Sequence, residues 1–159
     1  MITERWAVAA LRVFLVLLFG ILLVFQFLSM PGQFAHMAQE SPGSAHLRWP
    51  LTALFGFWIL CVQVVVVATW RLLTLVREDR IFSDAALVWV DAIVWAVGAA
   101  WAVLLGVSVL VGLGADDPGP VLVVVLATTG VTVLGLLMVV MRALLRRATE
   151  LRTDMEAVI

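Results

Sequence analysis

Four stretches without a charged residue constrain this chain of 159 residues more than any other feature. Charged residues bound each stretch: Arg12 and Glu40, Arg48 and Arg71, Asp91 and Asp116, and Asp117 and Arg142. The last three stretches run over positions 49–70, 92–115 and 118–141. As α-helix they would be roughly 33–36 Å long, and the hydrocarbon core of a bilayer is about 30 Å thick. Each of the three is therefore long enough to cross a membrane.

The composition agrees with a lipid environment. Apolar residues make up 64% of the chain and charged residues only 13%, whereas soluble domains are roughly 45–50% apolar. A small soluble domain cannot hide this much apolar surface from water, and disordered chains are poor in apolar residues. The formal net charge of −1 is uninformative, because the segregation of charge matters more than its sum in a membrane, but the lack of a dense basic face argues against direct nucleic acid binding. Because helix satisfies its own backbone in lipid, we expect an integral membrane protein.

We predict an all-α fold, an up-down-up-down bundle of four transmembrane helices that forms a single domain over residues 1–159. The first apolar run, residues 13–30, is longer than the core of a signal peptide, which has about 7–15 residues, so we expect it to be retained. Residues 31–49 then form a loop rich in turn formers such as Pro31 and Gly32. The expected spans are about residues 7–30, 50–76, 85–114 and 120–145, with a cytoplasmic tail helix over about 142–156.

The distribution of arginine predicts the orientation. If both termini lie on one side of the membrane, nine of the ten arginines share that side: Arg5, Arg12, Arg71, Arg77, Arg80, Arg142, Arg146, Arg147 and Arg152. The other side receives only Arg48. Short cytoplasmic segments are enriched in basic residues, so both termini are expected in the cytoplasm and the protein in the plasma membrane.

One charged residue closes each apolar stretch on the side of the termini: Arg12, Arg71, Asp91 and Arg142. Arg71 and Asp91 lie equally far from Ile81 along the chain, so an antiparallel hairpin that turns there would bring them level. The planar fork of arginine can hold a carboxylate with two hydrogen bonds, and we predict that Arg71 and Asp91 form an ion pair. Anchoring of the helix ends is one interpretation of these residues, and a proton, ion or ligand site is the other.

Small residues at four-residue spacing mark a helix-packing face in the third span: Gly98, Ala102 and Gly106. The fourth span carries a comparable set: Thr128, Thr132 and Gly135. Small residues let helix backbones approach closely in lipid, so we favour contact between these two spans over contact with a second subunit. Gln26 and Gln63 are the amides within the first two spans, and we expect them to form hydrogen bonds between helices.

The tail carries an apolar stripe with alternating four- and three-residue spacing: Leu144, Ala148, Leu151, Met155 and Val158. This is the spacing of a coiled-coil seam over two heptads. One interpretation is a solvated or membrane-surface helix end, and the other is a docking face for protein. We expect the stripe to contact the loop around Ile81 and Phe82, a second copy, or a soluble partner.

Signals for catalysis, cofactors and metals are weak. The sequence contains no metalloprotease, nucleophile-elbow or phosphate-loop motif, and Asp91 has no second carboxylate at its depth. His36, Met37 and His46 are possible copper ligands, but such a set arises easily by chance in a loop. We therefore predict no catalytic residue, no cofactor and no metal site.

Two stretches carry a family resemblance: Arg80-Ile81-Phe82-Ser83-Asp84 and the C-terminal Leu151-Arg152-Thr153-Asp154-Met155-Glu156-Ala157-Val158-Ile159. Together with the four spans, they resemble the bacterial membrane family catalogued as domain of unknown function 2975. The resemblance implies an uncharacterised four-span membrane protein, in some cases encoded beside a small helix-turn-helix regulator. It implies no catalytic residues.

Two classes of function follow from these observations. The first is a non-enzymatic accessory or signalling component of the plasma membrane that acts through helix–helix contacts. Its partners would be the lipid bilayer and either a second copy or another membrane or cytoplasmic protein. The alternative is a small oligomeric transporter or channel. A transporter usually shows internal repeats, broken helices or a charged residue at mid-membrane depth, and we therefore favour the first class.

Overall fold

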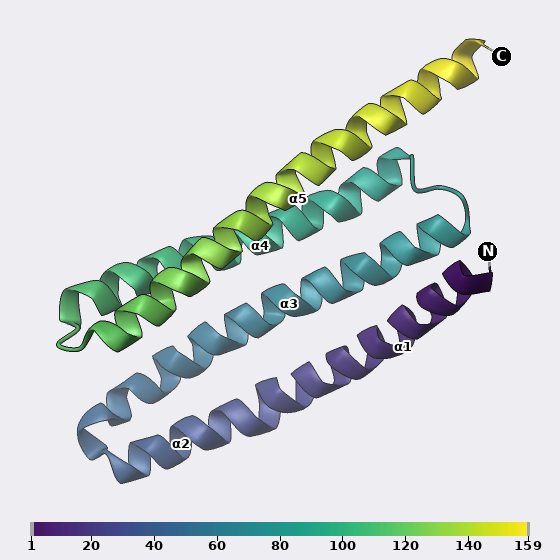
Figure 1. The fold of residues 1–159 in the computed structure, drawn as a ribbon. Helices are drawn as coiled ribbons and strands as arrows, with labels where there is room; N and C mark the ends of the chain where they lie inside the picture. Colours follow the sequence, from purple (N-terminus) through teal and green to yellow (C-terminus); the bar gives the residue numbers. More distant parts are fainter. Residues whose placement is uncertain (1, 159) are drawn as a thin grey trace. The chain divides into compact units, whose positions relative to one another are not determined.

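A computed structural model describes residues 2–158, without the side chains of residues 44, 45, 47 and 48. The elements along the chain are α1 (Ile2–Val24), the π-helical turn η1 (Phe25–Ser29), α2 (Met30–Glu40), the 3₁₀ helix η2 (Pro42–Leu47), α3 (Arg48–Arg77), α4 (Asp84–Gly114) and α5 (Pro118–Val158) (Figure 1). The predicted all-α class is confirmed, and no strand occurs within residues 2–158.

Four helical segments are long and apolar enough to cross a bilayer: Ile2–Glu40, Trp49–Arg77, Asp84–Gly114 and Pro118–Val158. The protein is thus a multi-pass membrane protein. The chain divides into two compact units, Met1–Trp70 and Arg71–Ile159, and each is described by itself.

In the first unit, α1, η1 and α2 continue one another without an intervening loop (Figure 1). The prediction that the helix ends at Pro31 and Gly32 is therefore wrong, and the loop begins only after Glu40. A proline lacks the amide hydrogen for the helical bond, and its ring crowds the carbonyl of the preceding turn. Here η1 ends at Ser29, with Met30 between it and the proline, and the amide of Met30 donates to the carbonyl of Phe25. This wider turn places Pro31 at the start of α2, where no amide hydrogen is needed.

Long side chains connect α1 and α2 with α3 inside this unit. Gln26 Nε2 donates to the carbonyl of Gly56 at 3.4 Å, which confirms the expected interhelical bond at this position. The rings of Phe34 and Phe55 lie 5.6 Å apart. At the other end, the Arg12 guanidinium lies 4.9 Å from the ring centre of Trp70. These contacts hold the helices through the tips of their side chains.

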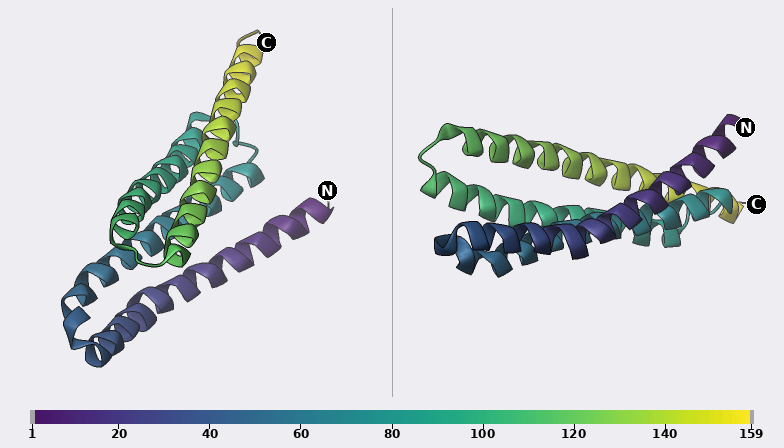
Figure 2. Two further views of the ribbon diagram at one scale, coloured as in Figure 1. Left: turned by 60° about the vertical axis from the view of Figure 1, so that its left-hand side comes forward. Right: turned by 90° about the horizontal axis from the view of Figure 1, so that it is seen from below.

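In the second unit, α4 and α5 form an antiparallel hairpin (Figures 1 and 2). The amide of Gly119 donates to Asp117 Oδ1 at 3.1 Å, which satisfies a free donor at the start of α5. Pro118 and Pro120 occupy the first turn of α5, where proline is tolerated. The connection between the helices is therefore limited to positions 115–117.

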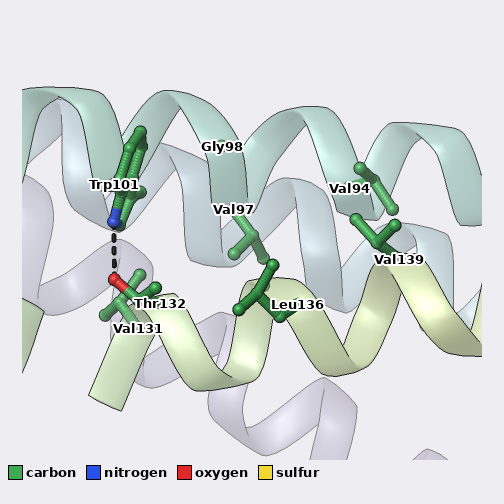
Figure 3. Close-up of a pocket in the computed structure, with 9 residues that line it drawn as sticks. Val94, Val97, Gly98, Trp101, Val131, Thr132, Leu136 and Val139 are labelled. Atoms are coloured by element: carbon green, nitrogen blue, oxygen red, sulfur yellow. Dashed lines mark hydrogen bonds between the residues drawn. The ribbon is translucent and has the colours of Figure 1, made fainter. Parts of the chain in front are cut away.

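Hydroxyl and small residues line the contact between α4 and α5. Trp101 Nε1 donates to Thr132 Oγ1 at 2.7 Å (Figure 3), and Ser108 shares a 2.8 Å hydrogen bond with Thr128. A Cβ atom added to Gly135 would lie 3.5 Å from Val97 Cγ1. Such residues allow close approach of helices in lipid, and they lie where the fourth span was predicted to pack.

Candidate functional site at the charged end of the α4–α5 hairpin

An ion pair joins α4 and α5 near the end of the hairpin away from its turn. Its members are Asp91 Oδ1 and Arg142 Nε, and their side chains are 39% and 38% exposed. Asp91 and Arg142 lie equally far along the chain from the turn that joins the two helices, counted from Asp116 and Asp117. The hairpin therefore brings them level, just as it brings Trp101 level with Thr132, which also lie equally far from the turn.

The predicted ion pair between Arg71 and Asp91 is wrong. The carboxylate of Asp91 contacts Arg142, and the guanidinium of Arg71 lies 5.6 Å from the ring centre of Trp89. Equal distances along the chain bring residues level only across a tight turn, and the connection at residues 78–83 does not form one. Stacking on Trp89 fits the interpretation of Arg71 as an anchor at the helix end.

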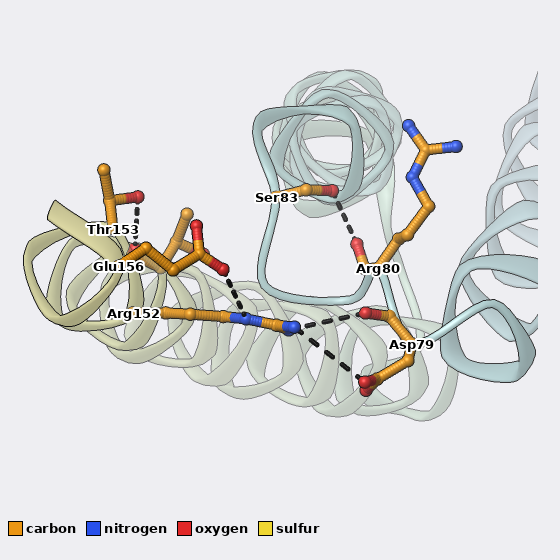
Figure 4. Close-up of polar contacts among 7 residues, drawn as sticks. Asp79, Arg80, Ser83, Arg152, Thr153 and Glu156 are labelled. Carbon is orange, nitrogen blue, oxygen red and sulfur yellow. Dashed lines mark hydrogen bonds and ion pairs between the residues drawn. The ribbon is translucent and has the colours of Figure 1, made fainter. Parts of the chain in front are cut away.

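The connection between α3 and α4 is folded back on itself. Asp79 has a positive φ of 56°, a conformation that aspartate tolerates better than most residues. The amide of Arg80 donates to the carbonyl of Leu75 at 2.8 Å, and Ser83 Oγ donates to the carbonyl of Arg80 at 2.5 Å (Figure 4). These bonds give residues 78–83 a defined shape.

Arg152 of α5 reaches this connection (Figure 4). Its Nη1 donates to the carbonyl of Asp79 at 3.4 Å, and its Nη2 lies 3.8 Å from the Asp79 carboxylate. The same guanidinium lies 6.0 Å from the ring centre of Phe82, while its Nε lies 3.5 Å from Glu156. Arg152 thus connects the C-terminal part of α5 to the connection between α3 and α4.

The predicted contact of the tail with this connection occurs, but the predicted stripe does not make it. Four of the five stripe residues are 54–87% exposed: Leu144, Leu151, Met155 and Val158. The packed face is instead formed by Leu145, Thr149 and Arg152, and Thr149 is only 6% exposed. The hydroxyl of Thr149 donates to the Leu145 carbonyl at 2.9 Å, which satisfies the buried polar group. The residues that face the connection thus lie one position further along α5 than the stripe, and contact of the stripe with a second copy or another protein stays a prediction.

The predicted packing face of the third span lies mostly outside the close contact with α5, with only Gly98 lining the groove between the two helices, and its contact with a second subunit stays a prediction. Gly98, Ala102 and Gly106 are exposed, and a Cβ atom added to either glycine meets nothing within 4 Å. The hairpin packs α4 against α5 through the adjacent face, which carries Val97 and Trp101. Val97 lies opposite Gly135, and Trp101 lies opposite Thr132.

Titratable side chains do not gather elsewhere among the residues that the structure describes. His36 Nε2 lies 3.4 Å from Glu40 within α2, and no three histidine, cysteine, aspartate or glutamate side chains within residues 2–158 lie close enough to hold one metal ion. Gln63 is buried, and its Nε2 has no hydrogen-bond partner among these residues. The charged end of the α4–α5 hairpin is therefore the candidate functional site.

The apolar helices and this hairpin define a multi-pass membrane protein. The model of the family described as "Protein of unknown function (DUF2975)" matches residues 32–159, and the chain belongs to this family. The match covers the whole α4–α5 hairpin and confirms the resemblance carried by the residue 80–84 segment and the C-terminus. No curated protein and no solved structure matches the chain.

Proposed function

We propose that the protein is a non-enzymatic accessory or signalling component of the plasma membrane that acts through helix–helix contacts with another protein. In this proposal both termini lie in the cytoplasm, which the nine-to-one distribution of arginine supports. The observation that carries the proposal is the exposed apolar stripe on the C-terminal part of α5. We call its exposed members, Leu144, Leu151, Met155 and Val158, the tail stripe.

The tail stripe lies largely beyond the reach of α4. α4 begins at Asp84. The residue of α5 at the same distance from the turn is Thr149, so Thr149 lies level with the start of α4. Residues 150–158 therefore extend past the hairpin by about 13 Å at about 1.5 Å per residue. Burial of each leucine-sized side chain contributes roughly 1.5–3 kcal/mol, so a partner that covers this stripe would bind with useful affinity.

Charge favours a protein partner over the membrane surface. Asp154 and Glu156 lie between the apolar positions of the tail stripe, and their carboxylates would face the anionic lipids of a cytoplasmic leaflet. In addition, Arg152 connects this part of α5 to Asp79. A partner would thus meet a helix that is already ordered, which lowers the entropic cost of binding.

Photo-crosslinking in living cells tests this proposal. A benzophenone amino acid at Leu151 should give one discrete protein adduct, and Met155→Gln/Val158→Gln should abolish that adduct. The matched control Thr153→Gln/Ala157→Gln changes two exposed residues of the same helix outside the stripe and should preserve it. An adduct of twice the chain mass would identify the partner as a second copy. Adducts with lipid alone, or equal adducts in both double variants, would contradict the proposal.

A further inference from the structure

Two hollows lie along the contact between α4 and α5. The first is an open groove of about 210 Å³ with almost entirely apolar walls, formed by residues such as Gly98 and Trp101 of α4 and Gly135 and Val139 of α5 (Figure 3). It lies within the uncharged stretches 92–115 and 118–141. We call it the apolar groove.

The second hollow has about 350 Å³ and mixed polar and apolar walls. Its charged residues are Asp84 of α4 and Arg146, Glu150 and Asp154 of α5. All four lie outside the uncharged stretches, toward the chain termini. One guanidinium and three carboxylates face this second hollow, which we call the polar hollow.

The two hollows lie on the same side of the hairpin. On α5, Thr132 and Val139 line the apolar groove and Arg146 lines the polar hollow, at steps of one heptad. On α4, Val94 and Leu87 repeat the same step. Residues one heptad apart on a helix share a face, with a drift of only about 20° per step. Each step corresponds to about 10.5 Å along the axis, so the hollows follow one another closely.

The Asp91–Arg142 ion pair lies between them. Three residues of α4 again follow one another at heptad spacing. They are Gly98, which lines the apolar groove, Asp91 of the ion pair, and Asp84, which lines the polar hollow. Along one side of the hairpin, the surface therefore changes from apolar to charged where the uncharged stretches end. This order matches an amphiphile whose chain lies in hydrocarbon and whose head group lies at the interface.

We propose that this surface binds one phospholipid with a zwitterionic, amine-bearing head group. One acyl chain occupies the apolar groove, and the phosphate binds the guanidinium of Arg146, whose planar fork suits phosphate oxygens. The ammonium group of the lipid contacts the carboxylates of Asp84, Glu150 or Asp154. The excess of carboxylates disfavours a head group that carries only negative charge. The Arg146–Glu150 contact of 3.3 Å is an exposed pair and is therefore weak enough to open for a ligand.

The site is separate from the tail stripe. No residue lines both, and Arg146 lies two positions from Leu144, on the opposite side of the helix; of the hollow's residues, Asp154 lies one turn from Leu151. Lipid binding and the proposed protein contact can therefore be tested independently.

The groove can be filled by one substitution. A Cβ atom at Gly98 meets nothing within 4 Å, so Gly98→Leu places its side chain in the groove without a backbone clash. Gly106→Leu is the matched control, because this glycine is equally open and lies two turns away, outside the groove lining. In the polar hollow, Arg146→Gln removes the guanidinium, and Arg147→Gln is the control at the neighbouring position outside the lining.

Native mass spectrometry of the full-length protein in mild detergent provides the test. The probes are phosphatidylethanolamine and phosphatidylglycerol with identical acyl chains, supplied at equal concentration. The wild-type protein should retain one phosphatidylethanolamine in preference to phosphatidylglycerol. Gly98→Leu and Arg146→Gln should each lower its retention about tenfold, the loss expected from one charge-assisted hydrogen bond or an equivalent contact. Both controls should retain the lipid as the wild type does.

Two results would overturn the proposal. One is equal retention of the two lipids by the wild-type protein, and the other is an equal loss in a variant and its matched control. Elution as a single folded species is required of each variant. If Gly98→Leu does not fold, the exposed substitution Arg146→Gln still decides the question.

Discussion

Two of the helix contacts in this chain, α4 with α5 and α1–α2 with α3, are made in different ways. Cα atoms of α4 and α5 come within 8 Å of each other, whereas no Cα atom of α1 or α2 comes this close to α3 in the part of the chain that the structure describes. The side chains at the contacts explain the difference. Gly135, Ser108 and Thr128 are small, while Phe34 and Phe55 keep their backbones apart.

Both contacts are built from equally apolar segments, so apolar content alone does not determine how closely two helices approach. In lipid there is no hydrophobic drive between helices, and association relies on packing and on interhelical hydrogen bonds. The α4–α5 contact has both, together with the Asp91–Arg142 pair. In the first unit, the hydrogen bond from Gln26 to Gly56 is long, and large rings lie at the contact. The hairpin should therefore respond more strongly to substitution.

The largest difference is expected between two glycine substitutions. Gly135→Leu should lower the free energy of unfolding by about 1–3 kcal/mol, because its Cβ already meets Val97 and the remaining atoms overpack the contact. Gly20→Leu in α1 should have no destabilising effect, since nothing lies within 4 Å of its Cβ and leucine favours helix. Unfolding in mixed detergent micelles with increasing SDS, followed by circular dichroism, measures both. Equal destabilisation by the two substitutions would remove the contrast between the units.

A smaller effect is expected for the ion pair. Asp91→Asn leaves the Arg142 guanidinium without its carboxylate, and we expect a loss of about 1–2 kcal/mol, between the values for exposed and buried pairs. Exchange of the two residues, Asp91→Arg with Arg142→Asp, should recover most of this loss in the same unfolding assay. Arg71→Gln should change stability less than Asp91→Asn does. A larger loss for Arg71→Gln would support the ion pair that the structure contradicts.

The smallest difference concerns single hydrogen bonds. Thr132→Val removes the acceptor of Trp101 and should lower stability by about 0.6–1.7 kcal/mol, the range found for bonds between helices in lipid. Gln26→Leu removes a bond of 3.4 Å, which is longer than the usual range, and should change stability by less. The contrast would fail if Gln26→Leu were the more destabilising of the two.

The four spans were predictable because uncharged length depends only on local sequence, whereas the continuation of the first helical segment past Pro31 to Glu40 was not. The Asp91–Arg142 ion pair was not predictable, because the path of the connection between two helices determines which of their residues lie at the same level. Residues 115–117 form a tight turn, so equal counts from it bring Asp91 to Arg142. Residues 78–83 fold back through Asp79 and the Ser83–Arg80 bond, so the midpoint at Ile81 does not set the level of Arg71.

The packed face of the C-terminal part of α5 could have been predicted from the spacing of small and polar residues, which a search for apolar residues does not detect. A series at heptad spacing runs along α5: Thr128, Gly135, Arg142 and Thr149. Thr128 and Gly135 belong to the predicted packing set of the fourth span. Continuing this series gives Thr149, the buried residue of the tail. The stripe through Leu144 and Leu151 follows apolar periodicity, whereas in a membrane protein a polar series can mark the contact.

The register of the α4–α5 hairpin, which brings Asp91 to Arg142 and Trp101 to Thr132, is the central feature of this structure. Cysteines at Val97 and Gly135, in a Cys61→Ala background, test it directly, because the Gly135 Cβ position lies 3.5 Å from Val97 Cγ1. Mild oxidation in native membranes should form a disulfide and protect both thiols from a maleimide mass tag. The control pair at Val97 and the exposed Leu134 should remain open to the tag. Free thiols in the Val97/Gly135 pair, or equal protection of the Val97/Leu134 pair, would contradict the account.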